Sequence, residues 1–82
     1  YKSLAESTLS KVNEEMEVVK ALIEVKKENI DLDEIEKILE EIEIYINKGK
    51  EMMKSGNYIA ANNWFNTALE KLIEMEDYLL NK

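Results

Sequence analysis

The sequence contains no cysteine, histidine, proline or arginine. Without cysteine and histidine, the chain cannot form a disulfide, a thiolate nucleophile, an imidazole base or a conventional zinc site, because these need sulfur or nitrogen ligands. Serine triads and cysteine dyads depend on an imidazole and are excluded with it. Without arginine there is no planar fork for bidentate binding of phosphate or carboxylate. We therefore expect no catalytic residues, no metal ligands and no cofactor.

Positive charge is scarce as well. Eighteen acidic residues against eleven lysines give a net charge of -7 at pH 7, and the longest basic run is Lys26-Lys27. Such a surface repels phosphate backbones, so we expect no nucleic-acid partner. No apolar run approaches the roughly 18–20 residues of a membrane span, so we expect no membrane insertion within this segment. The chain starts without an initiator Met, and we expect residues 1–82 to form a single helical domain that is a fragment or processed part of a longer chain.

What the sequence does contain is helical periodicity. Only two glycines interrupt 82 residues, and the apolar side chains recur at helical rather than alternating spacing. This pattern predicts an all-α fold with three helices, at about 4–28, 32–54 and 58–80. Similar helix lengths and short connections favour a three-helix antiparallel up-down-up bundle.

Several residues mark the expected helix ends. Ser3 and Asp31 are each followed three residues later by a glutamate, which is the spacing of a capping box. Gly56 suits a left-handed helix end, and Asn57 can cap the helix that follows. In the first helix the main apolar stripe runs from Ala5 to Ile23. A second seam is expected to widen its buried face and consists of Leu4, Val18, Leu22 and Val25.

Residues 45–69 resemble a single tetratricopeptide repeat. The matching residues are Tyr45, Gly49, Gly56-Asn57-Tyr58, Ala61, Phe65 and Ala68. The resemblance implies a helical hairpin in which small residues let two helices approach closely, within a domain that binds other proteins. A hairpin of this kind with one extra helix is also similar to microtubule-interacting-and-transport domains, which bind helical tails. The Gly-x-Tyr-x-x-Ala pattern further resembles helical appendages of archaeal proteins.

Two surfaces are candidates for partner binding. In tetratricopeptide domains that clamp a terminal carboxylate, the first helix supplies lysine and asparagine, and the corresponding positions here include Ile46, Lys50 and Met53. An apolar residue at position 46 favours apolar or basic helical partners over an acidic tail. The second surface is a stretch that is polar without charge, and charged groups are depleted at the centres of interfaces. Its candidate residues are Asn62, Asn63 and Asn66.

The leading hypothesis is a non-catalytic helical protein-interaction or structural module, appended to a larger protein. Its partner would be a helical segment of another protein or a neighbouring domain of the parent chain. The first alternative is a self-associating domain that forms a homodimer through the first or third helix. The third is a small acidic enzyme or cation-binding domain, which would use carboxylates such as Glu36, Glu40 and Glu43 on one helical ridge.

Overall fold

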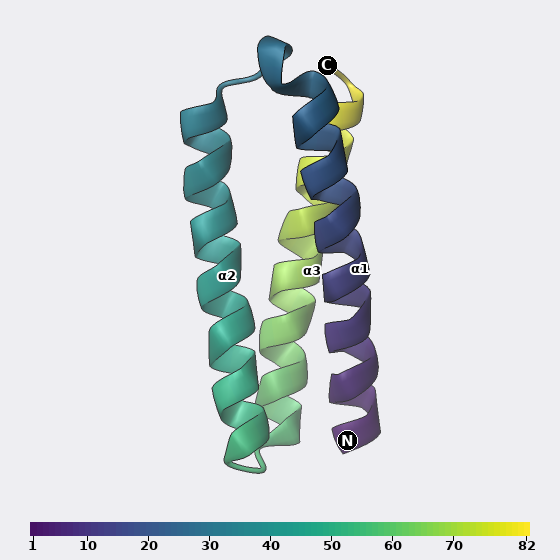
Figure 1. Ribbon diagram of the computed structural model, residues 1–82. Helices are drawn as coiled ribbons and strands as arrows, with labels where there is room; N and C mark the ends of the chain where they lie inside the picture. Colours follow the sequence, from purple (N-terminus) through teal and green to yellow (C-terminus); the bar gives the residue numbers. More distant parts are fainter.

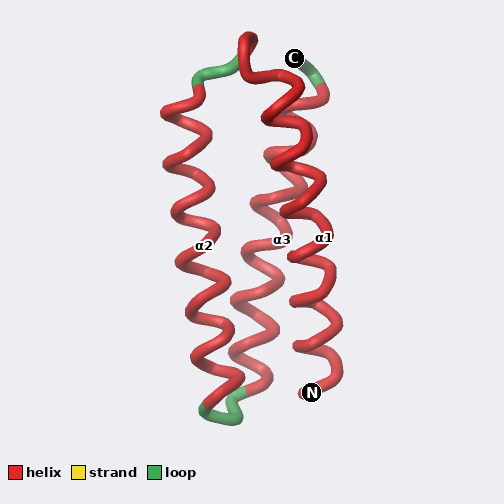
Figure 2. The backbone as a smooth tube through the Cα atoms, viewed as in Figure 1, coloured by secondary structure: helices red, strands yellow, loops and turns green.

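The chain folds into three long helices joined by two short connections (Figure 1). The computed structural model describes all residues, 1–82. No segment is a strand (Figure 2). α1 and α3 run in one direction and α2 runs in the other, which confirms the predicted up-down-up bundle. The elements are α1 (Lys2–Lys26), a 3₁₀ turn η1 (Lys27–Asn29), α2 (Leu32–Lys54) and α3 (Tyr58–Leu80).

The first helix is displaced from its predicted range of about 4–28. It begins two residues earlier because Ser3 does not cap it: Tyr1 holds the N-cap position without a side-chain hydrogen bond. The Tyr1 carbonyl accepts the first helical bond from the Ala5 N–H at 3.0 Å. At the other end the chain tightens into η1 before Ile30 turns to extended backbone. Nothing before Ser3 disfavours helical backbone, so the capping-box spacing alone misplaced this start.

The predicted bounds of α2 and α3 are confirmed, and local chemistry explains them. The Asp31 carboxylate accepts a hydrogen bond from the Glu34 N–H at 3.3 Å at the start of α2. Gly56 has a φ of 81°, the left-handed conformation that glycine adopts without a Cβ penalty. The N–H groups of Gly56 and Asn57 bond back to carbonyls of the last turn of α2 at 3.1 and 2.9 Å. The Asn57 side chain then accepts from the Ala60 N–H at 3.2 Å and starts α3.

α3 is the helix against which the other two pack. α1 and α2 are consecutive in the chain, yet they make hardly any contact with each other, whereas each packs along α3. α1 lies beside α3 as a parallel neighbour, and α2 is its antiparallel neighbour (Figure 1). The molecule is elongated, with extents of 43 × 19 × 14 Å. The fold therefore has one central helix and two flanking ones.

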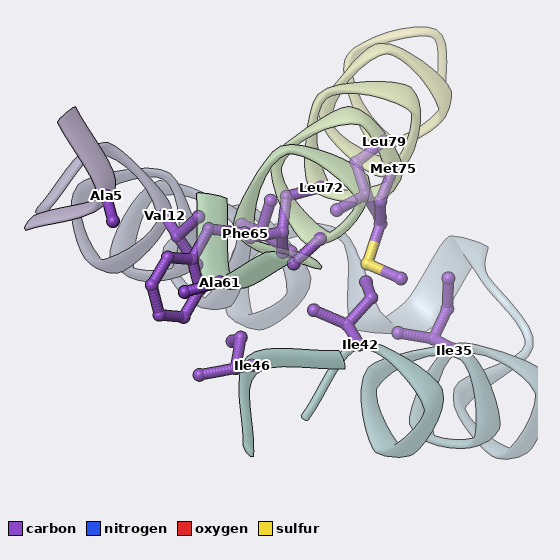
Figure 3. Close-up of a cluster of buried hydrophobic side chains, with 12 residues drawn as sticks. Ala5, Val12, Ile35, Ile42, Ile46, Ala61, Phe65, Leu72, Met75 and Leu79 are labelled. Carbon is purple, nitrogen blue, oxygen red and sulfur yellow. The ribbon is translucent and has the colours of Figure 1, made fainter. Parts of the chain in front are cut away.

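The core reflects this arrangement (Figure 3). It is one cluster of buried apolar side chains, and α3 supplies half of them. α2 contributes three isoleucines, and α1 contributes an alanine and two valines. The buried residues are Ala5, Val12, Val19, Ile35, Ile42, Ile46, Ala61, Phe65, Ala68, Leu72, Met75 and Leu79.

The second apolar seam predicted for the first helix is wrong. Leu4, Val18 and Val25 are exposed, and only Leu22 is partly buried. The packing of α1 explains why this seam is exposed. Met16 marks the side of α1 that faces α2, because it lines the groove between these two helices. Val18 is two residues further and thus roughly 200° around the helix, where neither neighbour covers it.

Gly49 allows α2 and α3 to approach closely. A Cβ at this position would lie 2.6 Å from Phe65 Cδ1 and closer still to Cε1, well inside van der Waals contact. The Phe65 side chain is fully buried, so its ring has no open space into which to move. The aromatic ring thus lies directly on the glycine.

We predict that Gly49→Ala lowers the free energy of unfolding by about 1–3 kcal/mol, because the added methyl group overpacks the core. Alanine at an unobstructed helix position would instead stabilise by roughly 1 kcal/mol relative to glycine. Urea denaturation followed by circular dichroism measures the change.

The Phe65→Leu background is the control, since a smaller side chain leaves room for the methyl group. There the cost of Gly49→Ala should shrink to within about 1 kcal/mol of zero. A wild-type background in which Gly49→Ala stabilises the protein would show that the ring does not block this site.

Candidate functional site

The larger of two surface clefts lies between the first half of α2 and the second half of α3. It has a volume of about 270 Å³, and its apolar wall is formed by Ile35, Ile38 and Met75. Ile35 and Met75 belong to the core, so the cleft opens directly above it. The full lining consists of Asp31, Glu34, Ile35, Ile38, Glu41, Lys71, Glu74, Met75 and Tyr78.

The rim of this α2–α3 cleft is acidic. Four carboxylates and one ammonium, that of Lys71, give it a net charge of -3. Two of the carboxylates are held in place: that of Asp31 caps α2, and that of Glu41 accepts a hydrogen bond from the Tyr45 hydroxyl. This hydrogen bond raises the pKa of Tyr45, with smaller contributions from burial and from the Glu41 charge. The cleft thus offers an apolar floor ringed by negative charge, of which two carboxylates are held by hydrogen bonds.

An aromatic stack holds α2 against α3 one turn from this rim. The rings of Tyr45 and Trp64 lie 5.8 Å apart at 27°, in a stacked arrangement. The Lys48 ammonium lies 5.6 Å from the centre of the Trp64 ring, within the range of a cation–π interaction. Because Tyr45 also holds Glu41, the stack links the packing of the two helices to the position of one rim carboxylate. The Trp64 ring is therefore occupied by contacts with Tyr45 and Lys48 of α2.

The structure separates the residues predicted for the first candidate surface. Ile46 and Lys50 line a second groove of about 220 Å³ between α1 and α2, together with Glu43. Ile46 is only 8% exposed and belongs to the core, while Lys50 is exposed. Met53 is not part of this groove; it is half-buried and packs against the core. The groove carries charges of both signs and little apolar surface.

The asparagines of the second candidate surface also differ from one another. Asn62 is half-buried between α1 and α3, where its Oδ1 atom lies 2.6 Å from the Thr8 hydroxyl. The same hydroxyl lies 3.0 Å from the Leu4 carbonyl, and its single proton goes to one acceptor at a time. Asn63 and Asn66 are exposed. Asn62 thus joins two helices of the domain, and the other two face outward.

A carboxylate with one unpartnered oxygen lies in the contact between α1 and α3. Glu15 is half-buried, and its Oε1 atom is buried without a hydrogen-bond partner. Burial raises the pKa of Glu15 above 4.5, and the neighbouring carboxylates of Glu76 and Asp77 raise it further. Since like charges meet here, this pair weakens the α1–α3 contact when both groups are ionised.

No three acidic side chains converge in a way that could hold a metal ion. No helix is long and apolar enough to cross a membrane. No family model matches this chain, and no curated protein or solved structure shows significant similarity to it. The geometry of the surfaces is therefore what supports a function.

The α2–α3 cleft was not predicted from the sequence. A signal was present on one side, because Glu34, Ile38 and Glu41 recur at helical spacing and alternate acid with apolar. The wall formed by α3 could not be predicted from its residue spacing. Which residues of α3 face α2 depends on the position of α1, and the sequence pattern of α3 is apolar on both sides.

We predict that Glu15→Gln stabilises the protein near pH 7 by a few tenths to about 1 kcal/mol, because it removes a half-buried charge and, with it, the repulsion from Glu76. The sign follows from linkage. The pKa of Glu15 is higher in the folded protein than the unfolded value of 4.5, so the folded protein binds this proton more tightly. The free energy of unfolding therefore falls as the pH rises from 4.5 through the folded-state pKa. The gain should therefore vanish below pH 4.5. Urea denaturation at several pH values measures the difference.

Glu14→Gln is the matched control, because Glu14 is an exposed neighbour on the same helix. It should change stability little at any pH. Equal effects of the two substitutions across the pH range would contradict a specific Glu15–Glu76 repulsion.

Proposed function

We propose that this chain is a non-catalytic helical protein-interaction module whose α2–α3 cleft binds a basic helical segment with aliphatic side chains. The observation that carries this proposal is the combination of an apolar floor with four rim carboxylates. A volume of about 270 Å³ is below the roughly 300–1,000 Å³ of typical small-molecule sites. It is better suited to one or two aliphatic side chains of a partner, as in helix-in-groove recognition.

Charge complementarity defines the partner. Asp31 and Glu34 lie on the α2 side of the cleft and Glu74 lies on the α3 side, so lysines or arginines flanking an apolar anchor would meet carboxylates on both walls. The net charge of -7 adds long-range attraction for a basic partner. An acidic tail is disfavoured for the same reason.

The resemblance of residues 45–69 to a tetratricopeptide hairpin agrees with this proposal, because such hairpins serve protein binding. We propose a tetratricopeptide-like hairpin from the residue pattern alone, whereas the binding site is proposed from the geometry of the cleft. We also propose, from the sequence, that this domain is a module appended to a larger protein. No specific observation favours the enzyme or cation-binding alternative.

Isothermal titration calorimetry with a synthetic amphipathic peptide of leucine and lysine tests the proposal. We expect Glu34→Lys/Glu74→Lys to weaken binding at least about tenfold, which corresponds to 1.4 kcal/mol. The peptide with glutamate in place of lysine should not bind, because the rim would repel it.

The matched control is Glu14→Lys/Glu36→Lys, which changes the net charge by the same amount at exposed positions outside the cleft. This variant should retain most of the affinity apart from a general loss of charge attraction. If both double variants weaken binding equally, the peptide recognises only the overall charge and the cleft is not the site.

A further inference from the structure

One end of the molecule carries few charged residues on the side formed by α1 and α3. The chain has no charged residue at 57–69, and its first ten residues include only Lys2 and Glu6. These segments form the first halves of α3 and α1, which start at the same end of the bundle (Figure 1). The contact between Thr8 and Asn62 holds them together. Of the 29 charged residues (18 acidic and 11 lysine), 27 therefore lie elsewhere.

The outward side chains here form two adjacent stripes. Ile59, Asn63 and Asn66 follow the i, i+4, i+7 spacing of one face of α3, and all three are exposed. Leu4 and Ser7 are exposed one turn apart on α1, and the Leu4 carbonyl approaches the same Thr8 hydroxyl that contacts Asn62. Ile59 is 55% exposed and Leu4 is 54% exposed. We call these five residues the uncharged face.

We infer that the uncharged face binds the same face of a second copy of this chain, in a weak dimer with two-fold symmetry. A two-fold interface brings each patch against itself, so its groups must be self-complementary. Asparagine amides meet this condition because each both donates and accepts hydrogen bonds, whereas paired lysines or paired glutamates would repel. Aliphatic side chains such as Ile59 and Leu4 are self-complementary as well.

The distribution of charge favours a second copy as the occupant. Two molecules that each carry -7 repel one another wherever their charged surfaces meet, and the uncharged face is where this repulsion is smallest. A basic partner gains nothing from an uncharged face and is drawn to the acidic surfaces instead. This inference does not depend on the α2–α3 cleft, which uses other residues.

The small area of the uncharged face indicates a weak dimer. Thirteen residues of helix span roughly 20 Å, and the molecule is 19 Å across. The face therefore offers about 400 Å² per copy, or about 800 Å² in total, below the 1,200–2,000 Å² of stable specific interfaces. We expect a transient dimer that forms only at high protein concentration.

Sedimentation equilibrium from about 10 µM to about 1 mM tests the inference. The apparent mass should rise from 9.6 kDa toward twice that value as concentration increases. Added salt should strengthen the dimer, because it screens the repulsion between the two acidic copies. Asn63→Lys/Asn66→Lys should weaken association at least about tenfold, since it places lysines opposite lysines across the two-fold axis.

Asn13→Lys/Asn47→Lys is the matched control. It makes the same chemical change at exposed positions that line the α1–α2 groove, and it should leave the dimer intact or slightly strengthened. Circular dichroism checks that each variant is helical, and Ile59→Ser tests the same face if the double lysine variant is not. A wild-type protein that stays monomeric up to about 1 mM overturns the inference, and so does equal behaviour of the two lysine variants.

Discussion

The burial of one stripe of α3 on two sides holds this molecule together. α2 covers one flank of the stripe and α1 covers the other, while α1 and α2 hardly touch. The tightest point is the ring of Phe65 on Gly49, where the absence of a side chain on α2 makes room for the largest one in the core. Further along the same pair of helices, the α2–α3 cleft opens above the core residues Ile35 and Met75.

The parts of the fold that depend on local chemistry could be predicted from the sequence. The bounds of α2 and α3 are set by Asp31, Gly56 and Asn57, whose roles are readable from residue type and spacing. The start of α1 could not be predicted, because a capping-box spacing at Ser3 does not require a helix to begin there. The second seam of α1 failed for a different reason: apolar periodicity gives the stripes of a helix but not the number of neighbours that cover them.

The candidate sites show the same limit. The sequence identified uncharged and apolar positions, but it could not place them relative to one another. Asn62 joins two helices of its own domain, while Asn63, the next residue, faces outward. The acid-rimmed cleft draws its walls from α2 and α3, and only the packing brings them together. Four of the eighteen acidic side chains line this cleft, whereas few charged residues lie in the first turns of α1 and α3.

The weak link between α1 and α2 has a consequence for how the molecule folds. The contacts of α1 are with α3, more than fifty residues away in the chain, so the entropy of closing a long loop is spent before they form. The α2–α3 hairpin, by contrast, closes through a three-residue turn. α1 adds two valines and an alanine to the core, packs larger side chains such as Leu9 and Met16 against it, and meets acidic side chains of α3 at Glu15. The contacts between α1 and α3 are thus the non-local ones of this fold, and we expect them to form after the turn between α2 and α3 has closed.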